Sequence, residues 1–376
     1  MIHRLAAWAA LGAATLLAGC VQTPPLGYDV LAARCPALTA AGPVEASRPI
    51  YFVGSNLPDC RGPVPLLTVG RGTPMPYGSP TPYGGPVRYG VATAPTAPKQ
   101  KQPDLALVAA DAWHARLAKD LAASGGRLLL FVHGYNNSPF AALERADLIA
   151  AAAHFDGPVV AFVWPSQASL TKYTWDEENA RWTQPYADAL LAELAGSARD
   201  VLLVSHSMGN RIAIDALRAL ERSSPEAARR IHTMVLADPD IDREMFDRDI
   251  AGSLVAPGRS ITLYASDHDL PLRSSRVVHG AFRVGDLRCG TKVKGARCYA
   301  APVKGMDIVD LSDVSATLLG HADFVEGPAG NADLCRVLNG KAPRGREPVA
   351  KGDAYLLTAA AATREDCPEG KKRLQP

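Results

Sequence analysis

The sequence predicts an α/β fold, in which a mostly parallel central sheet carries helices on both faces. Short runs of apolar residues recur along the chain, and helical patterns separate most of them. Strands that read as continuous apolar runs are typical of a parallel sheet buried on both sides. In such a sheet, functional residues lie beyond the carboxyl ends of the strands.

The strands expected before residue 104 lie in a stretch rich in Pro and Gly. They are RPIYFVG (48–54), PLLTVG (65–70) and VRYGVATA (87–94). The residues between them either form a flexible spacer or pack on the domain through Tyr77, Tyr83 and Tyr89. The sequence supports these two interpretations equally.

From residue 104 onward, helical and strand patterns alternate. A helix is expected over 104–124, and another should begin with Ser138 as its N-cap and Pro139 at its first helical position. The strands expected in this part of the chain are LLLFV (128–132), PVVAFVW (158–164), VLLV (201–204), TMVLA (233–237), ITLYA (261–265) and DIVDL (307–311).

Size and composition limit the classes of function. The 376 residues are 47% hydrophobic and 21% charged, which suits one large core with a modest appendage. Forty basic residues against 38 acidic ones give a formal charge of +2, and no basic stripe interleaved with aromatic residues stands out. This pattern argues against a nucleic-acid partner.

The first residues are typical of an export signal. His3 and Arg4 precede an apolar run over 5–18, which is too short to span a bilayer and is typical of a signal-peptide core. The run ends in Leu17-Ala18-Gly19-Cys20, which resembles the lipobox of bacterial lipoproteins. An ordinary signal peptide is the rival interpretation.

The lipobox resemblance implies a lipid-anchored protein. We expect a signal peptide over 1–19, acylation of Cys20 and a tether over 20–47. Several acyl chains on one residue give stable membrane attachment, unlike a single myristoyl chain. Because Val21 rather than Asp follows Cys20, the outer membrane facing the periplasm is the expected location.

The other cysteines also agree with export to an oxidising compartment. They are Cys35, Cys60, Cys289, Cys298, Cys335 and Cys367. Six cysteines allow 15 connectivities, so the sequence alone leaves the pairing open, although proximity suggests 35–60, 289–298 and 335–367. Zinc is not expected, because no CxxC or Cys-His pair occurs at ligand spacing.

One pentapeptide, Ser205-His206-Ser207-Met208-Gly209, is a candidate nucleophile turn. It lies between an expected strand and the amphipathic pattern NRIAIDALRAL, where a sharp turn would expose the hydroxyl of Ser207. Small residues two before and two after the serine let strand and helix approach. The usual pattern is G-x-S-x-G, so Ser205 is a mild departure.

A nucleophilic serine needs a base oriented by an acid. The chain order Ser, acid, His is that of α/β-hydrolases, which leaves His279 and His321 as candidate bases, and we favour His321 on its Gly-preceded turn.

The candidate acids follow two neighbouring strands. Asp269 and Asp267 follow ITLYAS, and Asp269 is the favoured acid. Asp238, Asp240 and Asp242 follow the preceding strand; Asp238 and Asp240 are interpreted as caps of a helix beginning near 242, although some hydrolases take the acid from that strand.

Backbone donors for an oxyanion are expected beside the nucleophile. The segment His133-Gly134-Tyr135 ends a strand, and the amide of Gly134 or Tyr135 would act together with that of Met208. One such donor is typically worth ~3 kcal/mol in the transition state.

The WPSQ turn is a second candidate for binding substrate. Trp164, Gln167, Tyr173 and Trp175 either line the substrate pocket or pack the loop against the helix from 176.

Six segments together resemble one known family. They are HGYNNSPFAALERADLIA, FDGPVVAFVWPSQASLTKYTWDEENA, SHSMGNRIAIDALR, VLADPDIDREMF, ITLYASDHDLPLRSSRVVHG and LGHADF. Over about 48–325, the chain is similar to the bacterial α/β-hydrolases labelled DUF900. The resemblance implies an α/β-hydrolase domain over 48–330, with Ser207 as nucleophile, Asp269 as acid and His321 as base, and leaves a Cys-containing extension over 331–376.

These residues predict a membrane-anchored serine hydrolase that cleaves small-molecule or lipid esters without a cofactor. Two alternatives remain open. One is a non-catalytic envelope lipoprotein that uses the fold for binding, and the other is an amidase, thioesterase or acyltransferase, because fold and triad do not separate these reactions.

Overall fold

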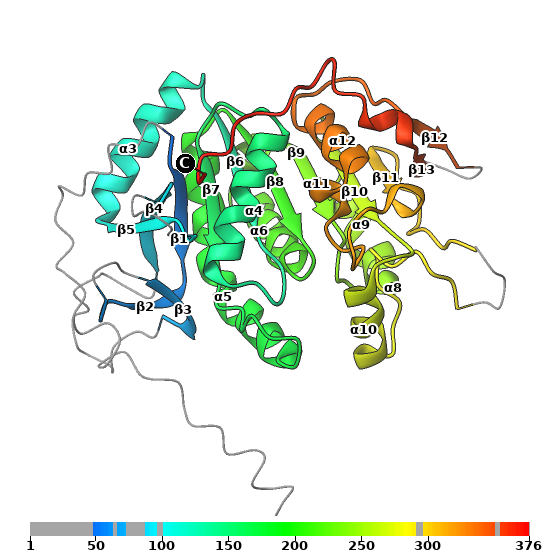
Figure 1. Cartoon of the computed structure of the whole chain (residues 1–376), viewed down its shortest axis with the longest axis horizontal. Coiled ribbons are helices and arrows are strands. Elements are labelled where there is room, and N and C mark those ends of the chain that lie inside the picture. The colour runs from blue at the N-terminus through cyan, green and yellow to red at the C-terminus, as the bar shows by residue number, and fades with distance from the viewer. Residues whose placement is uncertain are drawn as a thin grey trace, which may run out of the picture.

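A computed structural model describes residues 48–62, 66–72, 87–95, 101–290, 296–349 and 354–375. Its centre is an 11-stranded sheet with helices on both sides (Figure 1). In spatial order the strands are β12 (Arg346–Pro348), β13 (Ala354–Leu357), β11 (Met306–Asp310), β10 (Ser260–Ala265), β9 (Ile231–Ala237), β8 (Asp200–His206), β6 (Arg127–Val132), β7 (Val159–Val163), β1 (Ile50–Gly54), β4 (Arg88–Thr93) and β5 (Asp104–Val108).

The sheet is parallel from β13 to β1, and only β12, β4 and β5 pair antiparallel with their neighbours. This confirms the predicted α/β fold with a mostly parallel sheet. A separate hairpin is formed by β2 (Asn56–Asp59) and β3 (Leu66–Arg71).

Both faces of the sheet are buried, as the continuous apolar runs require. Along β6, Leu128 and Leu130 belong to the core on one face, and Leu129 and Phe131 to the core on the other. Each buried leucine contributes roughly 1.5–3 kcal/mol relative to an exposed one. The first face is covered by α3 (Ala110–Ala123), α5 (Tyr173–Ser197) and α6 (Gly209–Ser223), and the second by α4 (Pro139–Ala152), α11 (Asp323–Glu326) and α12 (Pro328–Leu338).

The remaining helices and helical turns are short. They are α7 (Pro225–Ala228), α8 (Arg243–Met245), α9 (Ala251–Leu254) and α10 (Leu270–His279), a π-turn over Phe246–Ile250, and 3₁₀ turns over Ser312–Val314 and Ala359–Ala362. Within the described ranges, no helix combines the length and apolarity needed to cross a bilayer.

The expected start of α4 is confirmed, whereas the helix expected over 104–124 is wrong in its first part. Ser138 Oγ accepts a 3.1 Å hydrogen bond from the amide of Ala141, and Pro139 opens α4. Residues 104–108 instead form β5, and α3 begins only at Ala110. The reason is tertiary: the edge of β4 offers unpaired backbone groups, and pairing with them outweighs local helix propensity.

The Pro/Gly-rich region contributes strands to the main sheet. Tyr89, on β4, packs its ring 5.1 Å from that of Trp113, which agrees with packing on the domain at this position. Tyr77 and Tyr83 lie outside the described residues.

Two of the expected disulfides are present. Cys289 pairs with Cys298 and Cys335 with Cys367, at Cα separations of 5.2 and 6.0 Å. Cys20 and Cys35 lie outside the described residues, so acylation and the 35–60 bond remain predictions.

The chain after 330 completes the same structural unit. The strand β13 extends the sheet beside β11, and the last described residues then run across α4 (Figure 1). We call residues 367–375 the C-terminal strap. In it, Gly370 N donates to Ala151 O, and the amides of Arg373 and Leu374 donate to the buried carboxylate of Asp147 at 2.6 and 2.9 Å.

Candidate active site

Ser207 lies on the turn between β8 and α6, with a left-handed backbone at φ 52°. This conformation costs a non-glycine residue about 1–3 kcal/mol, so neighbouring contacts must hold it. Asn210 supplies them, because its Nδ2 donates 2.9 Å hydrogen bonds to the carbonyls of Ser207 and Ala237. Ser205 Oγ in turn donates to Asn210 Oδ1 at 2.7 Å. Ser205 therefore supports the turn through a contact that Gly could not make.

Two glycines bring the neighbouring backbone against this turn. A Cβ on Gly209 would collide with the carbonyl of His133, and a Cβ on Gly134 would lie 2.6 Å from Ser207 Cβ. The loop expected to supply oxyanion donors is therefore packed directly on the serine. Within the described residues, the amides of Gly134, Tyr135 and Met208 donate no hydrogen bond, which leaves them available to bind a negatively charged oxygen.

The imidazole of His321 is held by Asp269. The Nδ1–H of His321 donates to Asp269 Oδ2 at 2.6 Å, and Asp269 Oδ1 accepts a 2.8 Å hydrogen bond from the amide of Leu272 as N-cap of α10. The preceding turn requires Gly320, which has φ 63° and whose Cβ would lie 2.6 Å from the carbonyl oxygen of His268. This arrangement leaves the Nε2 of His321 for another partner.

Burial and charge oppose each other at this pair. Burial lowers the pKa of His321, but the charge of Asp269 and its hydrogen bond raise it more strongly, and Asp238 and Asp240 add to the increase, so that it reaches about 9. Burial raises the pKa of Asp269 above its usual value, although His321 and the Leu272 amide act against the increase. A carboxylate in this position stabilises the imidazolium that forms when His321 takes up a proton.

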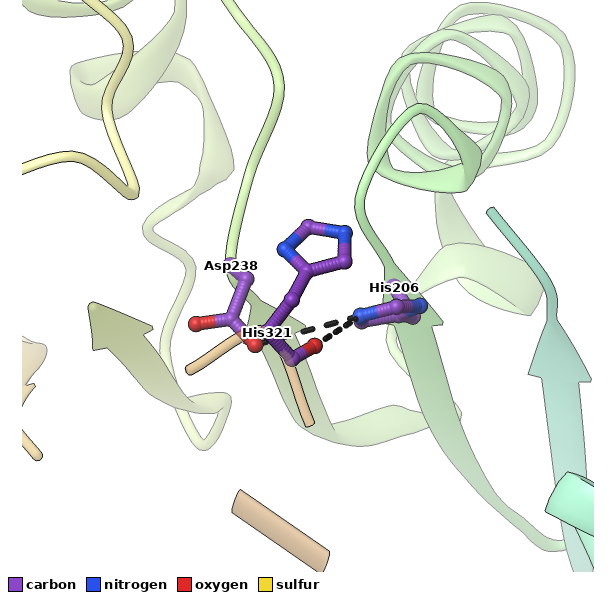
Figure 2. Close-up of side chains that lie close together, drawn as sticks. All are labelled: His206, Asp238 and His321. Atoms are coloured by element: carbon purple, nitrogen blue, oxygen red, sulfur yellow. Dashed lines mark hydrogen bonds and ion pairs between the residues drawn. The ribbon is translucent and has the colours of Figure 1, made fainter. Parts of the chain in front are cut away.

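His206, next to the candidate nucleophile, contacts the base (Figure 2). Its Nε2–H donates to the backbone carbonyl of His321 at 2.7 Å, and the two rings lie 4.6 Å apart. Burial and the nearby positive charge of His321 lower the pKa of His206 well below its usual value, so His206 is neutral. It therefore links the turn of Ser207 to the turn of His321 without adding charge.

Asp238 lies beside these two histidines (Figure 2) and is fully buried. Its Oδ2 lies 3.8 Å from His206 Nε2, and neither carboxyl oxygen forms a hydrogen bond within the described part of the chain. Burial raises the pKa of Asp238 well above its usual value, the charge of Asp269 raises it further, and His321 lowers it only in part. The surroundings of Asp238 therefore favour its protonated, neutral form. The prediction that it caps a helix is wrong.

The ligand atoms of His206, Asp238 and His321 lie within 4.8 Å of one another, close enough to share a metal ion. However, His206 Nε2 is already bonded to the His321 carbonyl, and His321 Nδ1 is bonded to Asp269. A cation that used these nitrogens would have to break both hydrogen bonds. The hydrogen bond from His206 to the His321 carbonyl therefore competes with metal binding at this cluster.

The turn of Ser207 thus packs against the oxyanion loop and is joined through His206 to the turn of His321, but one contact is missing. Within the described residues, no hydrogen bond joins Ser207 Oγ to His321. Such bonds often form only when substrate is bound. The structure connects the two turns indirectly, through His206.

The other titratable candidates are engaged elsewhere. His279 Nε2 pairs with Glu177 at 2.9 Å, away from Asp269. Asp240 does not cap a helix either, because it accepts hydrogen bonds from Ser275 and Tyr173 and lies 3.2 Å from Arg283. The nearby helix α8 is capped by Asp242, and Asp267 pairs with Arg297.

The four residues of the WPSQ region separate into buried and exposed ones. Trp164 is fully buried, stacks on His133 at 5.0 Å and donates from Nε1 to the carbonyl of His133, which supports the packing interpretation for this residue and not the pocket-lining one. Burial lowers the pKa of His133 to about 4, which keeps that imidazole neutral. The large indole of Trp164 thus packs against the oxyanion loop and holds it in place.

Gln167 and Tyr173 are also tied into the protein. Gln167 Nε2 donates to Val69 O at 2.8 Å, and Tyr173 donates to Asp240 and accepts a 3.0 Å hydrogen bond from Arg211. Trp175 alone is exposed.

His206 is a candidate functional residue that the sequence did not single out. Its position next to Ser207 in the pentapeptide is the feature that could have indicated a role in the site.

The mostly parallel sheet with helices on both faces has the α/β-hydrolase fold. The chain belongs to the family described as α/β hydrolases of unknown function, DUF900, whose model matches residues 109–337, more than half of the sequence. No curated protein matches the chain.

Several solved structures are similar in fold. A protein of the α/β hydrolase superfamily from Xanthomonas campestris pv. campestris is 16% identical, with 57% of this chain and 99% of that chain covered and a TM-score of 0.32. Lipase B from Aspergillus fumigatus is 16% identical over 55% of this chain and 47% of its own, with a TM-score of 0.30. Phospholipase PlaB from Legionella pneumophila is 10% identical over 57% and 60%, also with a TM-score of 0.30.

Proposed function

We propose that this protein is a serine hydrolase that cleaves carboxylic esters through an acyl-enzyme intermediate. The observation that carries the proposal is the Asp269–His321 hydrogen bond, which His206 links to the left-handed turn that holds Ser207. A turn of this kind costs free energy, and such strain is concentrated at functional sites.

Each group has a role in the proposed reaction. Ser207 Oγ attacks the ester carbonyl while the free Nε2 of His321 takes the serine proton, and Asp269 orients the ring. The amides of Gly134 or Tyr135 and Met208 bind the oxyanion. His321 then protonates the departing alcohol, and water, activated by the same imidazole, releases the acid.

A fluorophosphonate probe tests the activation of the serine. We expect it to label Ser207, as located by peptide mapping, and to leave the exposed Ser223 unlabelled. Ser207→Ala should lower kcat on p-nitrophenyl acetate by a factor on the order of 10⁶, whereas Ser223→Ala should keep full activity. A folded chain that the probe does not label would instead support a binding protein.

The acyl class is tested by competition. Purified protein is given ester, thioester and amide substrates with the same acyl group, and turnover of each is measured. We expect the ester to be consumed first. Faster consumption of the thioester or the amide would contradict ester hydrolysis as the main activity.

We also propose that the protein is exported and anchored at the outer membrane through Cys20. The support is the Leu17-Ala18-Gly19-Cys20 sequence after an apolar run. Mass spectrometry of the mature N-terminal peptide should find an acylated Cys20. An unmodified mature N-terminus at another residue would contradict this proposal.

A further inference from the structure

The large exposed apolar side chains are concentrated near the candidate active site. In the described part of the chain, all of them except Leu66 lie on four segments around the carboxyl ends of the strands. We call them the apolar surface: Leu170, Trp175, Met245, Leu270, Val277, Val278, Leu318 and Leu319. The side chain of Leu318 is 95% exposed and that of Val277 is 80% exposed. Apolar side chains that cluster on a surface in this way mark an interaction site.

Hydrogen bonds and ring contacts connect these segments. The amide of Leu270 donates to the carbonyl of Leu319 at 3.0 Å, which joins the start of α10 to the turn before His321. At the other end of α10, the ring of Tyr173 lies 5.2 Å from that of His279. Figure 1 shows α8, α10 and the first turns of α5 beyond the same end of the strands, in the lower part of the view.

The apolar surface directly borders the catalytic pair. Asp269 immediately precedes Leu270, and His321 follows Leu319 by two residues. A substrate that reaches Ser207 from this side would therefore pass exposed leucine and valine side chains.

Basic groups lie among the apolar ones. Arg273 and Arg276, on α10, line a cavity of about 600 Å³ together with Val277. Within the described residues, the guanidinium of Arg273 has no hydrogen-bond or ion-pair partner, whereas that of Arg276 lies 4.0 Å from Asp286. Lys172 lies 4.6 Å from the ring centre of the exposed Trp175. Asp267 also lines the cavity, but it is neutralised by Arg297 at 3.1 Å.

Apolar side chains interspersed with basic side chains suit the surface of an anionic membrane. The apolar groups enter the boundary between headgroups and acyl chains, and the cations meet the phosphates. A water-soluble ester would require neither feature.

We propose that the apolar surface docks on a phospholipid membrane containing anionic lipid, and that the substrate is a lipid ester drawn from that membrane. The substrate part of this inference rests on the proposed function, whereas the docking part does not.

Fluorescence quenching tests the docking directly. The full chain is reconstituted in phosphatidylcholine vesicles with brominated acyl chains, with and without phosphatidylglycerol. Bromine quenches only tryptophans that reach the lipid, so the quenched signal should fall strongly in Trp175→Phe. The matched control is Trp182→Phe, which removes a half-buried tryptophan from the same helix.

Substitutions elsewhere on the surface provide a second readout. The double variant Val277→Ser, Leu318→Ser should lose most of the quenching of Trp175, whereas Leu66→Ser, which changes an exposed leucine outside the apolar surface, should retain it. Arg273→Gln should weaken docking roughly fivefold on anionic vesicles only, because one basic residue near such a surface contributes about that factor.

The outcomes separate docking from catalysis. Equal quenching in the parent, the double variant and Trp175→Phe would overturn the docking, even if Ser207 reacts with the probe. A dimer that dissociates in the double variant, without quenching by lipid, would assign the apolar surface to a second copy and overturn the proposal. Quenching as expected without reaction of Ser207 would support docking and contradict the proposed function.

Discussion

Asp269 and Asp238 are two buried aspartates near His321, but their hydrogen-bond partners differ. Asp269 follows β10 and accepts hydrogen bonds from His321 and the Leu272 amide. Asp238 follows the neighbouring strand β9 and accepts none within the described residues. The comparison shows that burial alone does not make a carboxyl group an orienting acid. Local hydrogen-bond donors decide which aspartate carries the charge.

Electrostatics explains why only one of them needs to be ionised. An unpaired buried carboxylate loses its hydration without compensation, which is costly. Two nearby carboxylates also repel each other, so one keeps its proton. Asp269 has an imidazole and an amide to offset this cost, whereas Asp238 lies 3.8 Å from a histidine nitrogen that already donates elsewhere.

The largest difference between the two aspartates should appear in turnover. Asp269→Asn should lower kcat on p-nitrophenyl acetate by a factor on the order of 10⁴, because the amide no longer holds the correct tautomer of His321. Asp238→Asn, the matched control, should retain activity to within about tenfold. A comparable loss in both variants would show that Asp238 also orients the base.

A smaller difference is expected in stability. The pKa of Asp238 is raised on folding, so this group favours the folded state fully only below its unfolded pKa, and that contribution is lost as the pH rises. Asp238→Asn removes the titration. We therefore expect the variant to gain stability relative to the parent as the pH rises above the ordinary range of aspartate, by about 1–3 kcal/mol at most.

The measurement is the free energy of unfolding in urea at several pH values, with the disulfides kept oxidised. The gain should shrink as the pH falls through the ordinary range of aspartate. A gain that does not depend on pH would mean that Asp238 does not titrate on folding.

The smallest effect concerns the pH dependence of the reaction. His321 must be neutral to accept the proton of Ser207, so kcat/KM should rise with pH and level off above the pKa of His321, which Asp269 raises to about 9 against the effect of burial. Asp238 adds to that increase only when it is ionised. Because burial and the charge of Asp269 favour the protonated form of Asp238, we expect the midpoint to lie below 9 and to be unchanged in Asp238→Asn. A lower midpoint in the variant would show that Asp238 is charged.

Much of the fold could be predicted from sequence because the relevant signals are local. Continuous apolar runs located β6 to β11, and the Ser138-Pro139 pair located the start of α4. The edge strand β5 could not be predicted in this way. It forms by pairing with the edge of β4, and that edge exists only once the sheet has folded.

The site divides in the same way. The order of Ser207, Asp269 and His321 could be read from motifs, and the structure brings the latter two together. The positions of Trp164 and Asp238 could not, because a residue after a strand can face a cleft, a neighbouring loop or the core. Only the packing of His133 and His206 decides between these outcomes.

The C-terminal strap has a consequence for where the protein can mature. The Cys335–Cys367 bond joins it to α12, and its final residues cover Asp147 on α4. A chain made where thiols stay reduced would hold this segment by noncovalent contacts alone. We expect proteases to cleave this segment sooner in the reduced chain, so its resistance to limited proteolysis would report whether the bond has formed.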